Sequence, residues 1–531
     1  MSDDQSFDEV PEEEYLDTGP QEPGAMDEIL KKTPWWAISV AFHTIVLLIL
    51  WVVKIGVIPT AEQEVVIEAR IEEKEEPEYD PEKERDIIKR ESPLLESNVE
   101  AEVPVVVTEP VEVDDHFETD NDMETDTSQG FEDAVGFVDA GSVGVVSSIG
   151  VGGGGRGGRY GFRGGGGKKN AVGKYGGSKA TESAVDAALR WLMRHQGADG
   201  GWHPDTWSQL CPAGDSCVGA NGGGQNDTGG DYPASDTGFA LLAFLGAGHT
   251  HTTGSFRDTV KRGVEYLLKN QKQNGKIEAG AGRRMYTHGI AALALAEAYG
   301  MTQSAKLKGA AQDAIDYIVY VQNPLGGWNY SSPAARNDTS VSGWQMMALK
   351  SAKIGGLSVP EETIKRTIRY LEIISGKDYS GKVAYAVVGN DPNNPPAAGG
   401  GSIRMRAVGM LGRYFFGMSD PMCEIQKTSG DVFLKQLPAW EVGGGGGGVD
   451  LYYWYYATLV NFQTGGKYWK GWNEAMKTAL LNAQVKGKNH ADGSWPPVDT
   501  YSKQWSRPGI TALCALCLEV YYRYMPVYMG Q

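Results

Sequence analysis

The stretch Gln196-Gly-Ala-Asp-Gly-Gly-Trp202 decides the fold, because related versions of it recur through the C-terminal two thirds of the chain. Each version follows a helical pattern of mixed charge and precedes a more apolar one. Recurrence of one unit along a chain is typical of repeat architectures built from stacked supersecondary units. The later versions begin at Gln271, Gln322 and Gln484, and the last is lengthened and ends at Trp495.

The repeats predict pairs of helices. The second helix of each pair is apolar nearly all round, whereas the first has one apolar stripe, so the second helices belong inside and the first outside. Two further pairs lack the Gln/Trp signature, which gives six. The sequence therefore predicts an all-α fold over residues 181–531, an (α/α)6 toroid with a central cavity. The expected inner helices span residues 236–248, 286–300, 339–355, 404–416, 450–462 and 507–522.

The Gln-x-x-Asp-Gly-Gly-Trp form at Gln196 to Trp202 resembles the Gln/Trp repeat of squalene and oxidosqualene cyclases and of protein prenyltransferase β subunits. The resemblance runs from about Thr181 to Met529. It is strongest to bacterial prenyltransferase/squalene-oxidase repeat proteins. It implies the α/α toroid of the terpenoid-cyclase superfamily, whereas function depends on the residues of the site.

The N-terminal third predicts one membrane span. Residues 1–34 read as an acidic disordered tail, 35–58 as a transmembrane helix, and 59–180 as a flexible linker, first acidic and then Gly-rich. The 19 residues from Trp35 to Val53 would reach roughly 28 Å as a helix, about one hydrocarbon core. Lys31 and Lys32 favour a cytoplasmic N-terminus, and so a toroid in the periplasm of a cell with an inner membrane.

Ser39 and His43 lie four residues apart on one face of the expected span. This pair resembles the Ser-x-x-x-His of TonB-type energy transducers, which implies coupling to a proton-driven motor complex of the ExbB/ExbD type. An ionisable side chain in a membrane helix is itself a functional hypothesis.

Charge and cysteine content exclude other classes. The net charge of −19 comes mostly from the first 130 residues, so nucleic acid is not an expected partner. Five cysteines are too few for a disulfide scaffold, and Cys514 and Cys517 read as buried apolar residues. Cys211 and Cys217 flank a short polar loop and are expected to be able to form a disulfide in an oxidising compartment.

The toroid lacks the motifs that its relatives use for catalysis. It has no Asp-x-Asp-Asp to protonate an alkene, and Tyr452 stands where the Asp-x-Cys zinc pair of prenyltransferases would have cysteine. His490 lies in a loop, and the sequence pattern pairs it with no second metal ligand, so neither metal nor cofactor is expected. Asp236, Asp338 and Asp450 stand at inner-helix starts, where capping of the helix is one interpretation and chemistry the other.

The remaining candidates surround the expected cavity. Asp338, His288, Asp236 and Arg507 are the candidate catalytic groups. The candidate ligand-binding residues are aromatic or charged: Tyr286, Trp344, Arg404, Asp450, Tyr452, Tyr453, Trp454 and Trp505. Aromatic faces suit carbocations, isoprenoid chains and sugar rings alike. We therefore expect binding of a lipid, glycan or peptide. A terpenoid cyclase-like enzyme, a polysaccharide lyase-like enzyme and a TonB-like force-coupled protein are the alternatives.

Overall fold

The computed structural model describes residues 43–44, 162–163, 165–220, 230, 232–280, 284–331, 334–375, 380–395, 399–418, 422–441, 448–487, 489–498 and 502–524. The chain divides into the units Met1–Ser92 and Pro93–Gln531, and every helix and strand discussed below belongs to the second.

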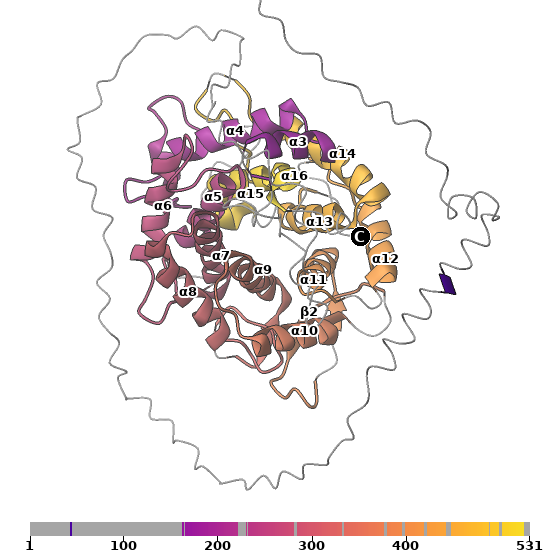
Figure 1. Cartoon of the computed structure of the whole chain (residues 1–531). Helices are drawn as coiled ribbons and strands as arrows, with labels where there is room; N and C mark the ends of the chain where they lie inside the picture. Colours follow the sequence, from indigo (N-terminus) through magenta and orange to yellow (C-terminus); the bar gives the residue numbers. More distant parts are fainter. Residues whose placement is uncertain are drawn as a thin grey trace, which may run out of the picture. The chain divides into compact units, whose positions relative to one another are not determined.

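Within the described residues, six helix pairs form a double ring (Figure 1). The outer helices are α4 (Lys179–Arg194), α6 (Arg257–Lys269), α8 (Ala305–Tyr320), α10 (Glu361–Ser375), α12 (Met422–Leu434) and α14 (Gly466–Ala483). The inner helices are α5 (Pro233–Gly246), α7 (Arg284–Thr302), α9 (Thr339–Gly355), α11 (Ile403–Phe415), α13 (Leu451–Thr464) and α15 (Ser502–Leu518). All six inner helices confirm the ranges expected from the repeats to within a few residues.

Burial explains why the pairs arrange themselves in two rings. Every residue of α5 is buried, whereas α6 buries only one stripe that includes Val260, Val264 and Leu267. Each inner helix contacts the next, and α15 contacts α5, so the inner ring is closed. An all-round apolar helix is stable only when it is covered on every side.

The Gln/Trp repeat connects neighbouring helix pairs through hydrogen bonds. The Gln196 side-chain amide donates to the Gly200 carbonyl in its own turn and to the Thr259 carbonyl in the next outer helix. Gln271, Gln322 and Gln484 repeat this pattern with Ala310, Thr363 and Ala184. Each tryptophan of the repeat is buried, and its indole N–H donates a hydrogen bond to a carbonyl of its own outer helix, as Trp202 does to the Leu192 carbonyl. The structural interpretation of the repeat is confirmed.

Glycine is required in these turns by close approach. Gly326 has φ of +97°, and a Cβ there would lie 1.8 Å from the Arg366 carbonyl oxygen of the next outer helix. Gly200, Gly275 and Gly493 have the same left-handed conformation and face backbone at similarly short distances. The turn can therefore contact the backbone of the next outer helix this closely only if the residue has no side chain.

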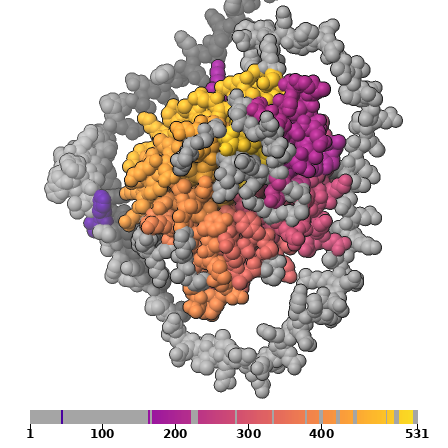
Figure 2. All heavy atoms as spheres, turned by 180° about the vertical axis from the view of Figure 1, so that it is seen from behind, coloured from indigo at the N-terminus to yellow at the C-terminus, as the bar shows by residue number. Residues whose placement is uncertain are grey.

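The first and last pairs close the ring. In Figure 2 the magenta N-terminal helices lie beside the yellow C-terminal ones. Gln484 donates to Ala184 of α4, and the Arg194 guanidinium donates to the Asp492 carbonyl. The helical domain also starts earlier than Thr181, because α3 (Gly165–Tyr175) packs on α16 (Val520–Arg523). These residues lie within the range that composition alone assigns to the linker.

The fold is not purely helical. β1 (Arg336–Asp338), β2 (Ala384–Val388) and β3 (Gly399–Gly401) form a small antiparallel sheet in the order β1-β2-β3. Asp338 pairs with Ala386, which in turn pairs with Gly399. The sheet joins the loop before α9 to the connection between α10 and α11, so the all-α prediction is correct for the rings and misses this edge.

The predicted membrane span lies outside the described residues, apart from His43 and Thr44, which are helical and exposed. Among the described residues, no helix is both long enough and apolar enough to cross a bilayer. Ser39 and the predicted tail and acidic linker also lie outside the described residues.

Candidate functional site

Asp236 is a fully buried carboxyl group at the start of α5. Its Oδ2 accepts a hydrogen bond of 2.8 Å from the Ser506 hydroxyl, and its Oδ1 has no hydrogen-bond partner. Burial raises the pKa of Asp236 well above its usual value, and the hydrogen bond from Ser506 offsets only part of this effect. Burial therefore favours the neutral, protonated form of this carboxyl group.

The backbone around Ser506 is strained where it meets this acid. Ser506 has φ of +54° and ψ of −180° and interrupts α15 two residues before Pro508. Such a conformation is rare for a residue other than glycine and persists only where the surroundings hold it. Gly509 allows the approach, because a Cβ there would lie 2.9 Å from Asp236 Oδ1 and 2.8 Å from the Trp505 Cβ.

A continuous set of rings, which we call the aromatic cluster, lies next to Asp236. Phe239, one turn along α5, packs edge-on against Trp344 and Trp505, with ring centroids 5.2 and 5.4 Å apart. Trp344 also stacks on Tyr455 at 5.6 Å. The cluster draws on five inner helices, α5, α7, α9, α13 and α15, and consists of Phe239, Tyr286, Trp344, Tyr452, Tyr455, Tyr456 and Trp505.

Two polar atoms in the cluster have no hydrogen-bond partner. These are the Trp344 indole Nε1 and the Tyr456 hydroxyl, and both residues are fully buried. Native proteins satisfy most buried polar atoms, so each exception calls for a physical reason such as a bound molecule. With Asp236 Oδ1 they make three unsatisfied polar atoms in or beside one apolar cluster.

The other two acids at inner-helix starts are caps. Asp338 precedes α9 and accepts from the backbone N–H groups of Ser340 and Val341, and Arg336 pairs with its second oxygen at 3.0 Å. Asp450 accepts from the Tyr453 N–H and forms an ion pair with Arg404. The capping interpretation is thus confirmed for these two and is wrong for Asp236, because the N-cap position of α5 is Tyr232.

The side chains of His288 and Arg507 both form hydrogen bonds with other parts of the fold. His288 Nδ1 accepts from the Ile277 N–H, and Nε2 donates to the Ala314 carbonyl; burial lowers the pKa of this imidazole to about 4. The Arg507 guanidinium donates to Ser494 Oγ and to the Ala220 carbonyl. Both side chains connect loops to helices, which favours positioning over chemistry.

Two of the predicted ligand-binding residues, Tyr453 and Trp454, point away from the aromatic cluster. Tyr453 contacts Phe433 and Trp472 in the outer ring, and its hydroxyl donates to the Gln436 carbonyl. Trp454 packs on Trp440. Along the run Tyr452 to Tyr456 it is therefore Tyr452, Tyr455 and Tyr456 that face the cluster, a choice that composition alone could not make because every residue of α13 up to Gln463 is buried.

A second group of buried ionisable side chains lies at the opposite end of α5. Burial alone would raise the pKa of Glu297, but Arg163 and Arg523 pair with it at 2.7 and 3.0 Å and lower its pKa below the usual value. Glu519 is also fully buried, and a Cβ at Gly246 would meet its Oε2. Burial raises the pKa of Glu519 to about 8. Sequence reasoning missed all four ionisable side chains, since nothing in the sequence marks an interior position in an apolar helix or a Gly-rich segment.

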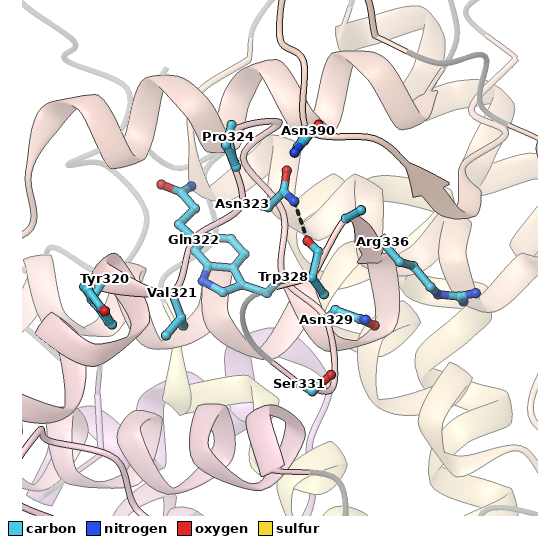
Figure 3. A pocket seen from close by; sticks show the side chains of 12 residues that line it. Tyr320, Val321, Gln322, Asn323, Pro324, Trp328, Asn329, Ser331, Arg336 and Asn390 are labelled. Carbon is cyan, nitrogen blue, oxygen red and sulfur yellow. Dashed lines mark hydrogen bonds between the residues drawn. The ribbon is translucent and has the colours of Figure 1, made fainter. Parts of the chain in front are cut away.

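A groove of about 380 Å³ lies beside the third Gln/Trp turn (Figure 3). Tyr320 and Arg336 stand toward its two ends, and Trp328 lies between them. Gln322 Oε1 and Asn329 Oδ1 have no partner there. The loop that lines the groove continues into Tyr330, which stacks on Tyr286 of the aromatic cluster with centroids 6.1 Å apart.

Comparisons with solved structures give several matches of low identity. An inactive variant of the α-1,6-mannanase GH76A of Salegentibacter sp. HEL1_6, in complex with α-1,6-mannotetrose, is 12% identical, with 64% of this chain and 100% of that chain covered and a TM-score of 0.43. The unsaturated glucuronyl hydrolase from Bacillus sp. GL1 is 14% identical, with 65% and 99% covered and a TM-score of 0.46.

Comparison of the sequence with curated proteins gives no match. Residues 167–287 match the family model of the squalene-hopene cyclase C-terminal domain. Over these residues the chain is similar to the squalene-hopene cyclase C-terminal domain, and the match confirms the resemblance to the terpenoid-cyclase superfamily for this part of the chain.

Proposed function

We propose that the toroid binds an isoprenoid lipid against the aromatic cluster of its inner helices. The observation that carries this proposal is the contiguity of the cluster, whose rings come from five different inner helices and meet around Trp344 and Trp505. Ring faces of this kind hold apolar chains and stabilise positive charge. The three polar atoms that lack a hydrogen-bond partner beside the rings could bond to a small uncharged polar group at the end of the lipid, such as a hydroxyl.

An isoprenoid fits this site better than a glycan or a peptide. A sugar has a hydroxyl on nearly every carbon, and each buried hydroxyl without a partner costs on the order of 1–3 kcal/mol. The cluster offers few polar atoms, and burial favours the neutral form of the neighbouring Asp236 carboxyl group. The groove at Gln322 and Asn329, whose amide oxygens have no partner, is the place where a glycan would bind instead.

Acid catalysis at Asp236 is the second candidate function, favoured by the unpartnered Oδ1 of this fully buried carboxyl group beside Trp505. In this reaction the O–H bond of Asp236 breaks and a new C–H bond forms on one carbon of an alkene. The other carbon becomes a carbocation next to aromatic faces. Loss of a proton from a neighbouring carbon, or addition of water followed by loss of one of its protons, neutralises the cation, and the carboxylate regains its proton from solvent.

Ligand binding is tested on the full-length protein in detergent by native mass spectrometry with lipid extraction. Tyr456→Phe removes the unpartnered hydroxyl, and Tyr453→Phe is the matched control because its hydroxyl faces the outer ring. We expect an isoprenoid lipid to accompany the wild type and the control and to be depleted in Tyr456→Phe. Equal lipid in all three forms would argue against the cluster as the site.

Acid chemistry is tested with squalene as the probe in D2O. Protonation by Asp236 places one solvent deuterium on carbon in the product, and Asp236→Asn abolishes it, whereas Asp258→Asn on the exposed face of α6 does not. Gas chromatography with mass detection measures the label. If squalene is bound but returns without deuterium, the binding proposal stands and the catalytic one fails.

We further propose that residues 35–58 anchor the toroid to the inner membrane with its N-terminus in the cytoplasm, as the Lys31, Lys32 flank indicates. Protease added to spheroplasts should then digest the toroid and spare the N-terminal tail. Coupling of Ser39 and His43 to a motor of the ExbB/ExbD type predicts that His43→Ala abolishes cross-linking to such a motor. A toroid protected from external protease would contradict this orientation.

A further inference from the structure

Two cysteines and two histidines from distant parts of the chain meet at the junction of the first and last repeats. The ligand-type atoms of His195, Cys211, Cys217 and His490 all lie within 4.8 Å of one another. Cys211 and Cys217 are free thiols rather than a disulfide. His490, for which the sequence pattern suggested no second metal ligand, lies close to both of them. We propose that these four residues bind a Zn²⁺ ion.

The distances within the group fit the edges of a zinc tetrahedron. His195 Nε2 lies 3.5 Å from both Cys211 Sγ and Cys217 Sγ, and His490 Nδ1 lies 3.4 Å from Cys217 Sγ. With Zn–S bonds of about 2.3 Å and Zn–N bonds of about 2.0–2.1 Å, a tetrahedral S···N edge is about 3.5 Å. These three edges therefore already match the geometry of a zinc site, and the other pairs of ligand-type atoms lie within 4.8 Å of one another.

The histidine His195 is oriented as metal-binding histidines are. It caps the C-terminal end of α4, and its Nδ1 lies 2.8 Å from the Trp191 carbonyl oxygen. A carbonyl can only accept, so Nδ1 carries the proton and the Nε2 lone pair faces the two sulfurs. The ring also stacks on Trp191 with centroids 3.9 Å apart. Second-shell contacts of this kind fix the tautomer and the direction of a ligand.

The donor set identifies the ion. Two thiols and two imidazoles select zinc over calcium and magnesium, which take oxygen ligands. Four protein ligands also leave no open position for water or substrate, so the site is structural rather than catalytic. His195 and Cys217 are buried, which shields the ion from solvent.

The location gives the ion a role in closing the ring. His195 belongs to the first outer helix, and His490 lies in the turn between α14 and α15, so the ion joins the first repeat to the last. Asp215, between the two cysteines, already accepts from the His490 N–H at 2.8 Å. The same loop binds Arg507 through the Ala220 carbonyl, next to Ser506 and hence to Asp236. Loss of the ion would therefore loosen the start of α15.

The test is the metal content of the full-length protein purified in detergent. We expect one equivalent of zinc in the wild type and in the controls Cys514→Ala and His203→Ala, measured by inductively coupled plasma mass spectrometry. In Cys217→Ser and His490→Ala we expect bound zinc to fall by about tenfold or more. Equal zinc in all forms, or none in the wild type, overturns the proposal.

A measurement on the wild type alone avoids the risk that a variant fails to fold. Zinc is removed with a chelator under reducing conditions, and Co²⁺ is added as the probe. The site predicts a thiolate-to-cobalt charge-transfer band and the strong visible bands of tetrahedral Co²⁺. Reduced thiols that give neither band, or a non-reduced peptide with Cys211 linked to Cys217, overturn the proposal.

Discussion

Asp236 and Glu519 show how one physical effect can produce two kinds of buried acid. Both are fully buried and have a raised pKa, because an ionised carboxylate is costly to remove from water. Asp236 faces the aromatic cluster at the start of α5, whereas Glu519 meets Gly246 at the end of the same helix. Glu297, equally buried, is ionised because two arginines pair with it.

Glu519 makes stability fall as pH rises. The native protein keeps a proton on this group up to about pH 8, whereas the unfolded chain releases it above its ordinary pKa of 4.5. The contribution of Glu519 to stability is therefore greatest below pH 4.5 and declines toward pH 8, by up to about 1.4 kcal/mol per pH unit. Glu519→Gln should remove this decline, which urea unfolding between pH 5 and 8 measures; an unchanged slope would contradict the raised pKa.

At the scale of the element, the Gln/Trp turn is the unit that the sequence predicts best. Its glutamine, glycine and tryptophan each perform a local task that depends only on nearby backbone, such as the Gln322 bond to Gly326. The six inner helices were predictable for the same reason, since an apolar pattern on all faces is visible in sequence. The small sheet was not, because β2 and β3 pair across a loop with no periodic pattern.

The turn glycines make a sharp prediction. Gly326→Ala should destabilise the protein by more than about 2 kcal/mol, because the new Cβ would meet the Arg366 carbonyl at a residue with positive φ. Gly173→Ala is the matched control, since a Cβ there meets nothing within 4 Å and helix propensity favours alanine by about 0.5–1 kcal/mol. Denaturant titration measures both, and equal effects would refute the packing argument.

The candidate site was predictable only in part, for reasons that also belong to this scale. Tyr286, Trp344, Tyr452 and Trp505 could be named because aromatic residues at inner-helix starts are visible in sequence, and the structure brings these four into one cluster. The distinction between Asp236 and the capping acid Asp338 depends on a kink at Ser506, which is 270 residues away. The cysteine and histidine group likewise depends on ring closure.

At the scale of the whole molecule, closure of the ring is the feature on which the interior depends. The inner helices complete their circle through α15 and α5, so any weakness at this junction exposes the interior. The junction is secured by Gln484, by Arg194 and by the cysteine and histidine group described above.

Removal of one of these contacts should lower the free energy of unfolding of the whole domain. Gln484→Ala removes two hydrogen bonds and leaves the Ala184 and Gly493 carbonyls buried without this donor, at a cost of about 1–3 kcal/mol. Gln209→Ala, at an exposed position, should change stability by less than about 0.5 kcal/mol. Hydrogen exchange of α4 and α15 should rise together in the first variant; a rise confined to one helix would argue against closure as a shared property.

The most direct test of the central claim is photo-crosslinking of the full-length protein with a polyprenol that carries a diazirine, followed by peptide mapping. Binding at the aromatic cluster predicts labelled peptides from α5, α9, α13 and α15, and a marked loss of label in Tyr456→Phe but not in Tyr453→Phe. Label confined to residues 320–336 or to the N-terminal span, unaffected by either substitution, would contradict the claim that the inner ring is the lipid site.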